Sequence, residues 1–270
     1  MSELAAALQA ESAAKRWQAI ANLPHTPPVK LADTATLALL VQALADEHPF
    51  VRWQAGLALA SREDGRQKLI ELLKGEPEAA SAPLARSAAV DALGARKSAD
   101  LQALLIDSLQ TGDALLRQSA AEALASQGNL AAVPHLIAAL KDGDPWVRRA
   151  AAYALGHLGD KQVAEVLVES LTDQAVVVRR SAAYALGALR ADGALAKLKI
   201  SLTDNDPQVR RNAAWALGRI GLAEAVPDLT RLLDDPALNG MVAAAAHEAI
   251  EVISKPRWLR LLWGVHRHFQ

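Results

Sequence analysis

A ten-residue segment recurs along the chain at a spacing of 31 residues. It reads VRRAAAYALG from Val147, VRRSAAYALG from Val178 and VRRNAAWALG from Val209. Copies with weaker similarity begin at Lys15, Val51, Ala85, Leu116 and Val242. Periods of 20–50 residues are typical of arrays in which each short unit buries its apolar face against the next unit. The spacing therefore predicts stacked units rather than a fold built around one central core.

Each unit is predicted to be a pair of helices. The recurring segment carries apolar residues at the spacing of one buried stripe of an amphipathic helix. In the copy that starts at Val147, these are Val147, Ala151, Ala154, Leu155 and Leu158. A second helical segment precedes most copies, over residues 34–45, 64–74, 99–110, 130–141, 161–172, 192–203 and 223–234. Two helices and two turns leave no room for strands, and the abundance of alanine also favours helices.

The turns carry residues that begin and end helices. The segments KDGDP (141–145) and TDNDP (203–207) place Asp where it caps the next helix and Pro in the first helical turn. Four glycines fall near the other end of the recurring helix: Gly156, Gly159, Gly218 and Gly221. We expect a left-handed backbone there, because this conformation ends many helices and favours glycine.

The segments DPWVRRAAAYALGHLGD and DPQVRRNAAWALGRIG resemble the short HEAT-like repeats of phycobilisome chromophore lyases. The resemblance spans about residues 15–253 and implies an all-α fold. This fold is an α-solenoid, a superhelix of about seven to eight helix pairs, with the second helix of each pair on the concave side. It also implies a ladder of Asp–Arg pairs that joins consecutive turns, namely Asp46–Arg52, Asp142–Arg148, Asp173–Arg179 and Asp204–Arg210.

The last residues break the repeat pattern. We expect the solenoid over residues 1–253 and a separate basic, aromatic-rich tail over 254–270, which includes KPRWLRLLWGVHRHFQ. Pro256 ends or redirects the preceding helix. Three interpretations of the tail remain open: a helix that caps the exposed end of the array, a segment that docks on a partner protein, or a contact with an anionic membrane surface.

Three positions in each recurring helix are predicted to point away from the buried stripe. They lie one residue after the ladder arginine, and again four and eight residues later. In the last three full repeats they hold Arg149, Tyr153 and His157, then Arg180, Tyr184 and Ala188, then Arg211, Trp215 and Arg219. Because stacked helices lie about 10 Å apart, we expect a column of arginines beside a column of aromatic residues.

Arginine, tyrosine and tryptophan are enriched at the energetic centres of protein interfaces. We therefore predict that these positions, with Trp258 and Trp263 of the tail, bind a partner with an acidic or aromatic surface. The net charge agrees, since it is −3 over residues 1–140 and +2 over 141–270. In a second interpretation, the arginines only solvate this face, with their stems over the aromatic rings. Earlier repeats differ at these positions, where they hold Trp17, Trp53, Leu57, Asp91 and Glu122.

Composition excludes several other classes of protein. The chain has no cysteine, which removes disulfides and thiolate metal sites and fits a cytoplasmic location. Its net charge of −1 argues against nucleic acid as a partner. The N-terminus lacks the apolar region of a signal peptide, and no apolar run is long enough to cross a membrane. The seven histidines form no pattern of metal ligands, so no metal site and no catalytic residue are predicted.

These observations favour a non-enzymatic scaffold, assembly factor or accessory subunit that binds a partner protein through its concave face and its tail, without a cofactor. The resemblance implies an alternative, a bilin lyase or chaperone that acts on a phycobiliprotein. Arginines would then pair with bilin propionates, and Tyr153, Tyr184 or Trp215 would stack on the pyrrole rings. A second alternative is a peripheral membrane adaptor that uses the tail.

Overall fold

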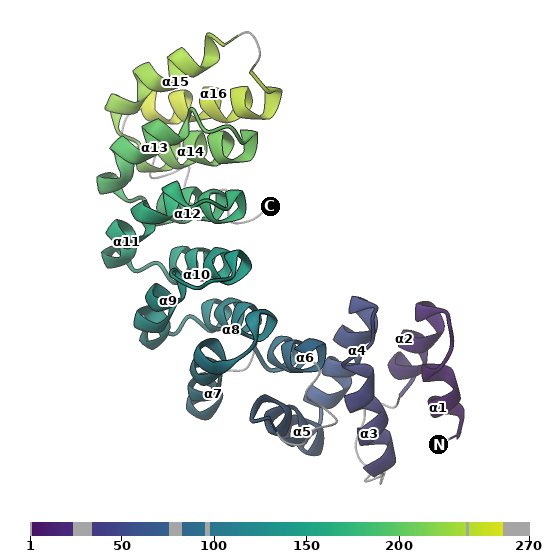
Figure 1. Ribbon diagram of the computed structural model, residues 1–270. Helices are drawn as coiled ribbons and strands as arrows, with labels where there is room; N and C mark the ends of the chain where they lie inside the picture. Colours follow the sequence, from purple (N-terminus) through teal and green to yellow (C-terminus); the bar gives the residue numbers. More distant parts are fainter. Residues whose placement is uncertain (1, 24–33, 76–82, 95–97, 236–237, 256–270) are drawn as a thin grey trace. The chain divides into compact units, whose positions relative to one another are not determined.

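The helices follow one another in pairs, and within each of two units of the chain the second helices of successive pairs pack side by side (Figure 1). The computed structural model describes residues 2–23, 34–75, 83–94, 98–235 and 238–255. These residues form α-helices, short 3-10 helices and turns, and they contain no β-strand. The chain is therefore an all-α solenoid, as the 31-residue spacing predicts.

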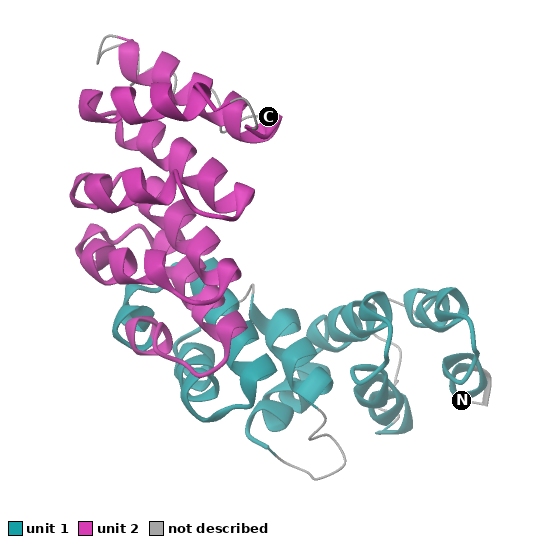
Figure 2. Cartoon of the chain, turned by 45° about the horizontal axis from the view of Figure 1, so that its top comes forward, with its two compact units in different colours: residues 1–135 teal, residues 136–270 magenta. Residues whose placement is uncertain are grey.

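The chain divides into two compact units, residues 1–135 and 136–270 (Figure 2). In unit 1, the second helices α2, α4, α6 and α8 neighbour one another in series. The helices of unit 1 are α1 (Ser2–Leu8), α2 (Ala13–Ala21), α3 (Thr34–Ala43), α4 (Pro49–Ala60), α5 (Glu63–Leu73), α6 (Pro83–Gly94), α7 (Ala99–Thr111) and α8 (Ala114–Gln127). Helix α1 lies outside the predicted helical segments. A 3-10 turn, Leu130–Ala132, then leads into α9 (Val133–Ala139), within which unit 1 ends.

Unit 2 repeats the same arrangement with more regular spacing. Helices α10, α12, α14 and α16 neighbour one another, and each of the first helices α11, α13 and α15 packs on the second helix that follows it. The helices are α10 (Pro145–Leu158), α11 (Ala164–Glu169), α12 (Val176–Leu189), α13 (Leu195–Ser201), α14 (Pro207–Ile220), α15 (Val226–Leu233) and α16 (Gly240–Ser254). A 3-10 turn opens each first helix, over Lys161–Val163, Asp192–Ala194 and Ala223–Ala225.

The buried stripe predicted for the recurring helix forms the core. Val147, Ala151, Ala154 and Leu155 are fully buried, and Leu158 is half-buried. The corresponding leucines 186 and 217 are also fully buried. The predicted caps are present as well: the carboxylates of Asp144 and Asp206 accept backbone N–H groups at the start of α10 and α14, and Pro follows each of them.

Only two of the four glycines predicted to be left-handed adopt that conformation. Gly159 and Gly221 end α10 and α14 with φ of 78°. Gly156 and Gly218 lie inside these helices, so the prediction is wrong for them. A methyl group at Gly156 would lie 2.6 Å from the Cα atom of Ala185, on the neighbouring helix. Gly156 and Gly218 therefore allow consecutive second helices to approach closely.

Candidate partner-binding surface

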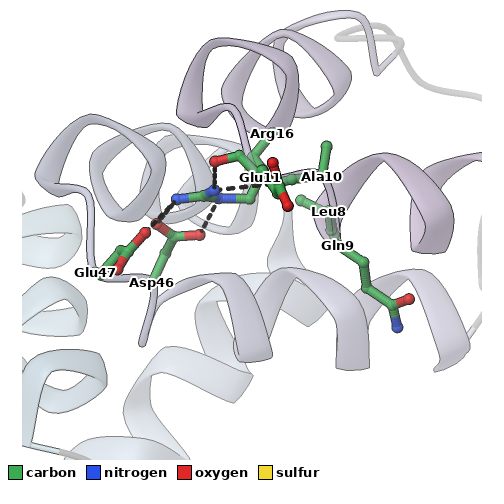
Figure 3. A pocket seen from close by; sticks show the side chains of 7 residues that line it. All are labelled: Leu8, Gln9, Ala10, Glu11, Arg16, Asp46 and Glu47. Atoms are coloured by element: carbon green, nitrogen blue, oxygen red, sulfur yellow. Dashed lines mark hydrogen bonds and ion pairs between the residues drawn. The ribbon is translucent and has the colours of Figure 1, made fainter.

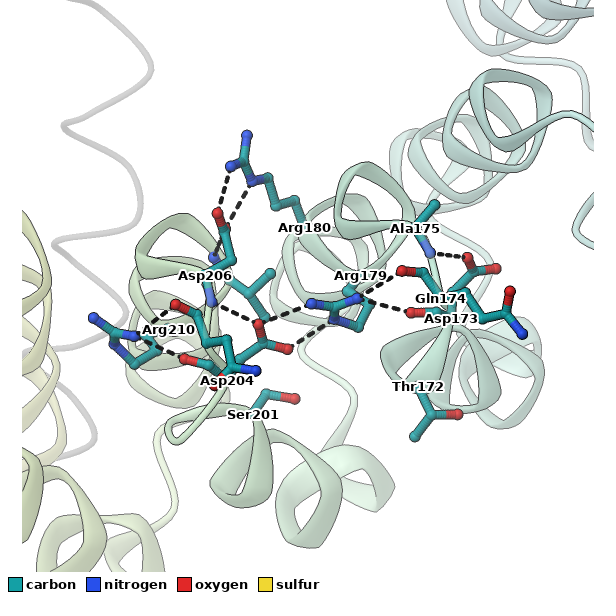
Figure 4. A network of polar contacts seen from close by, with 12 residues as sticks. Thr172, Asp173, Gln174, Ala175, Arg179, Arg180, Ser201, Asp204, Asp206 and Arg210 are labelled. Carbon is teal, nitrogen blue, oxygen red and sulfur yellow. Dashed lines mark hydrogen bonds and ion pairs between the residues drawn. The ribbon is translucent and has the colours of Figure 1, made fainter.

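At the start of α2, α10 and α12, an arginine bonds two consecutive turns. Arg148 donates to the carbonyl of Asp142 (2.8 Å) in its own turn and to both carboxylate oxygens of Asp173 (2.8 and 3.0 Å) in the next. Arg179 repeats this pattern on Asp204 (2.8 and 3.0 Å; Figure 4). The ladder implied by the family resemblance is therefore present between consecutive turns at Arg148 and Arg179. Each of these two arginines reaches the carbonyl of the aspartate six residues before it and the carboxylate of the aspartate 25 residues after it.

The ladder arginines perturb the carboxylates that they contact. Burial is the largest single influence on the pKa of Asp173 and of Asp204 and would raise both values. The hydrogen bonds from Arg148 and Arg179, a backbone N–H bond to each carboxylate and the charge of the arginines together outweigh it, so both pKa values are lowered. These aspartates are therefore ionised at neutral pH. Because the carboxylate and the carbonyls use the guanidinium donors, the ladder arginines have a structural role.

A shallow pocket in unit 1 is built by the same device (Figure 3). Its lining consists of Leu8, Gln9, Ala10, Glu11, Arg16, Asp46 and Glu47. Arg16 donates to both carboxylate oxygens of Asp46 (2.7 and 2.9 Å) and to the carbonyls of Ala10 and Glu11 (2.9 and 2.8 Å). The only large cation of this pocket is thus fully engaged, so we assign it to the ladder rather than to ligand binding.

Three aromatic residues on the second helices of unit 2 form one stacked row. The ring centroids of Tyr153 and Tyr184 are 6.2 Å apart with an angle of 15° between the planes, and those of Tyr184 and Trp215 are 5.1 Å apart with an angle of 8°. His157 stacks on Tyr153 at 6.0 Å. Tyr153 and Tyr184 are 38% and 41% exposed. We call Tyr153, Tyr184 and Trp215 the aromatic row; the repeat spacing places their rings in contact across α10, α12 and α14.

The three arginines beside the aromatic row have different surroundings. Arg180 forms a two-bond ion pair with Asp206 (2.8 and 2.6 Å), the residue that caps α14 (Figure 4). This pairing lowers the pKa of Asp206 to about 2. The corresponding residue before α12 is Ala175, which carries no carboxylate, and Arg149 lies over the Trp146 ring at 5.7 Å. Arg211 is exposed and donates to the Gln208 side chain (3.2 Å).

Arg219 closes the aromatic row at the end of α14. Its guanidinium lies 5.8 Å from the centroid of the Trp215 ring. Burial, together with the positive charge of Arg190, lowers the pKa of Arg219. Its Nε atom is buried and has no hydrogen-bond partner among the residues that the structure describes. All eight predicted contact residues before the tail therefore lie on the second helices of unit 2, and their role in binding stays a prediction.

Two residues of this surface were missed in the sequence. Trp146 is 52% exposed and directly follows Pro145 at the start of its helix. Phe50 follows Pro49 in the same way, so comparison of the repeats shows two turns in which an aromatic residue follows proline. Arg190 occupies the position of Gly159 and Gly221, 31 residues from each. Alignment of the repeats at 31 residues therefore identifies Arg190 as an unusual residue, because a basic side chain stands where two other repeats have the glycine that ends the helix.

The same helix positions in unit 1 carry different chemistry. Phe50 contacts Trp17 edge to face and stacks on Trp53, both at 5.3 Å between ring centroids. Farther along, the equivalent positions of α6 and α8 hold Asp91 and Glu122. Partial burial of the carboxyl and the charge of Glu122 raise the pKa of Asp91 to about 6, against the opposing charge of Arg52. We call Asp91 and Glu122 the acidic pair.

Other kinds of site have no support in the described part of the chain. It contains no group of three or more histidine, aspartate or glutamate side chains placed to hold a metal ion. Among its helices, none combines the length and apolar character that a membrane crossing requires. The predicted contacts of Trp258 and Trp263, and the tail from residue 256 onward, lie outside the described residues.

A family model for HEAT repeats matches the chain four times, over residues 67–144, 103–187, 133–206 and 176–251. The matches overlap and together cover residues 67–251, more than half of the chain. Among curated proteins, a sequence comparison finds no match.

Solved structures show the same fold. YibA of Escherichia coli matches with a TM-score of 0.60 and 20% identity over 92% of this chain and 91% of its own. A structure of Kap95p bound to RanGDP matches with a TM-score of 0.60 and 13% identity, over 93% of this chain and 41% of the other. The complex of CpcE and CpcF of phycocyanin lyase from Nostoc matches 56% of this chain and 99% of its own, with 24% identity and a TM-score of 0.49.

Proposed function

Because the chain belongs to the HEAT-repeat family, we propose that it is a non-enzymatic scaffold, an assembly factor or an accessory subunit, that binds a partner protein. The proposed contact surface is the aromatic row with the arginines beside it. The partner would present acidic and aromatic groups to this surface. The cysteine-free composition fits a reducing compartment, so the proposal places this scaffold in the cytoplasm.

The stacking of the aromatic row carries the proposal. Three rings on three separate helices lie nearly parallel, and two of them remain more than a third exposed. A side chain that is already held by its neighbours loses little conformational entropy when a partner covers it. Aromatic anchors of this kind, flanked by arginine, supply much of the binding energy in protein interfaces.

The charges of the surface define the partner further. Arg180 pairs with a carboxylate from the following turn, Asp206, while Arg149 and Arg219 lie over tryptophan rings. A guanidinium over an aromatic face keeps its positive charge and its outward N–H donors. Acidic side chains of a partner would therefore meet donors beside exposed rings. Because this surface rests on packed helices, we expect little backbone change on binding.

Selection of peptides from a random displayed library tests this function. We expect the selected peptides to combine Asp or Glu with Phe, Tyr or Trp. The double variant Tyr153→Ala/Tyr184→Ala should bind them at least ten-fold more weakly, which corresponds to about 1.4 kcal/mol, because it removes both exposed rings. Binding would be measured by fluorescence anisotropy, with folding checked by circular dichroism.

The matched control is Ile200→Ala, which truncates another exposed apolar side chain, 64% exposed, on α13 of the same unit. A second control, Lys161→Glu/Lys197→Glu, changes the charge of unit 2 on exposed residues outside the second helices. Both controls should bind the peptides as the unchanged protein does. Equal binding by the double Tyr variant, or a library without any enriched peptide, would contradict the proposal.

A further inference from the structure

Helix α12 ends differently from its counterparts. Helices α8, α10 and α14 are followed by Gly128, Gly159 and Gly221, all with a left-handed backbone. Helix α12 is followed by Arg190, with φ of 50° and ψ of 52°. Within the described residues, Arg190 is the only residue other than glycine with a positive φ. A side chain in this conformation weakens folding by roughly five- to thirty-fold in the equilibrium constant, so the position favours glycine for stability.

Arg190 lies where the aromatic row meets the end of α12. Three residues before it, Gly187 makes room for the Trp215 ring, because a methyl group at Gly187 would lie 2.6 Å from the ring atom Cζ3. One turn after Trp215, the Arg219 guanidinium lies over the same ring. Tyr184 stacks on this ring as well. The ends of α12 and α14 thus meet at the Trp215 ring, with Arg219 over the ring and Arg190 three residues beyond the glycine that faces it.

The two arginines repel each other and have no acidic partner on the described residues. Neither Arg190 nor Arg219 forms an ion pair there, and the buried Nε of Arg219 has no acceptor. Burial lowers the pKa of Arg219 most, and the positive charge of Arg190 lowers it further. The ladder arginines differ from Arg190 and Arg219, because their N–H groups donate hydrogen bonds to carboxylates and carbonyls. A residue held in a strained backbone conformation is typical of a functional site, and guanidinium groups without an acidic partner can bind an anion.

We propose that Arg190 and Arg219 form an anion-binding subsite that receives a carboxylate of the partner, next to an aromatic group that packs on Tyr184 and Trp215. This inference rests on the proposed function and specifies which group of the partner is recognised. The planar guanidinium of arginine matches the two oxygens of a carboxylate. The ligand also neutralises the repulsion between the two arginines, which a neutral ligand does not.

The test separates charge from backbone strain at one position. Arg190→Gly should lower the unfolding equilibrium constant about five-fold or more, because glycine adopts φ of 50° without strain. Arg190→Ala should give no such gain. Both variants should weaken binding of glutarate at least ten-fold, followed through the Nε–Hε signal of Arg219 by NMR. Arg190→Lys should bind glutarate with an affinity between those of the unchanged protein and Arg190→Ala, since it keeps the charge but loses the planar guanidinium.

Three controls complete the experiment. Glutaramide, which has the shape of glutarate without its charge, should not shift the Arg219 signal. Inorganic phosphate should bind more weakly than glutarate; tighter phosphate binding would overturn the carboxylate assignment. Arg231→Gln removes an exposed arginine on α15 and should leave glutarate binding unchanged.

The inference and the proposed function fail in different ways. If Arg190→Gly is more stable but binds glutarate and the selected peptides as tightly as the unchanged protein, the subsite is rejected while the aromatic row stands. If glutarate binds through Arg190 but no peptide depends on Tyr153 and Tyr184, the subsite stands and the proposed scaffold surface does not. An Arg219 signal that fails to shift in a saturable way also rejects the subsite.

Discussion

Units 1 and 2 are built from the same helix pairs but carry opposite chemistry on equivalent positions. Unit 2 places arginines beside a stacked row of exposed rings, and its net charge is +2. Unit 1 places an aromatic cluster on α2 and α4 and the acidic pair on α6 and α8, and its net charge is −3. The difference teaches that the buried stripe sets the framework, while the outward positions vary without affecting it.

The packing of the two units differs too. In unit 2, the Asp–Arg ladder repeats with the same distances at Arg148 and Arg179. In unit 1, Arg16 pairs closely with Asp46, but Arg86 and Asp113 are 3.9 Å apart. Regular 31-residue spacing thus accompanies regular contacts between turns.

The largest expected effect tests how closely the helices approach in each unit. A methyl group at Gly156 would meet the backbone of Ala185 at 2.6 Å, whereas one at Gly94 would meet only the Cβ of Ala123, at 3.1 Å. We expect Gly156→Ala to destabilise the protein by about 1–3 kcal/mol. Gly94→Ala should be nearly neutral, since the gain in helix propensity of about 1 kcal/mol offsets the mild contact.

Urea unfolding followed by circular dichroism measures both variants. Gly143→Ala serves as the control, because a methyl group there meets nothing within 4 Å. Equal losses at Gly94 and Gly156 would show that the two units do not differ in packing.

The next effect concerns the ion pair of Arg180 with Asp206 in unit 2. The folded-state pKa of Asp206, about 2, lies below its unfolded value of 3.8, so the pair stabilises the protein above pH 4 and this stability is lost as pH falls toward 2. Asp206→Asn keeps a good helix cap and should cost about 1–2 kcal/mol at pH 7, allowing for the partial exposure of Arg180. Unfolding free energies at pH 7 and pH 2.5 check this, and a loss that does not shrink at low pH would contradict it.

In unit 1, Asp91 should respond to pH in the opposite direction. Its folded-state pKa, about 6, lies above 3.8, so the charged form is disfavoured and stability falls as pH rises from about 4 to 6. Asp91→Asn should therefore stabilise the protein at pH 7 by less than about 1 kcal/mol, after screening by water, and have little effect at pH 4. A variant that is less stable than the unchanged protein at pH 7 would reject this account of the acidic pair.

The smallest effects distinguish the two proline-aromatic turns. Trp146 in unit 2 contacts the Arg149 guanidinium, so Trp146→Ala should cost about 0.5 kcal/mol. Phe50 in unit 1 contacts both Trp17 and Trp53, so Phe50→Ala should cost slightly more, about 0.5–1 kcal/mol. Thermal unfolding of the two variants side by side gives the order, and the reverse order would weaken the comparison.

The regular part of the fold could be predicted because its physical causes repeat. An apolar stripe and a ladder arginine return every 31 residues, and an Asp cap precedes α8, α10 and α14. The helices and the positions of the aromatic row therefore follow from the spacing. The roles of Gly156 and Gly218 were predicted wrongly because a glycine inside a helix and one that ends it look alike when three residues separate them. Contact with Ala185 on the next helix distinguishes Gly156.

Other features depend on how far side chains reach across space. Arg180 pairs with Asp206, 26 residues farther along the chain. No pattern in the sequence indicates that the Arg180 side chain turns toward this aspartate. Helix α1 was missed because its seven residues precede the first recognisable copy of the segment. The family resemblance indicated the ladder correctly, but the partner of each arginine required coordinates.

The ladder arginines bond to residues farther along the chain, and this limits how the chain can change in length. Arg148 and Arg179 each bond to a carboxylate 25 residues ahead and a carbonyl six residues behind, so the two distances together make one period. If 31 residues are removed or duplicated anywhere within 142–206, each ladder arginine still meets an aspartate carboxylate and a turn carbonyl at the equivalent positions. Removal of a shorter stretch misaligns them, so this protein is expected to tolerate insertions and deletions in whole periods only.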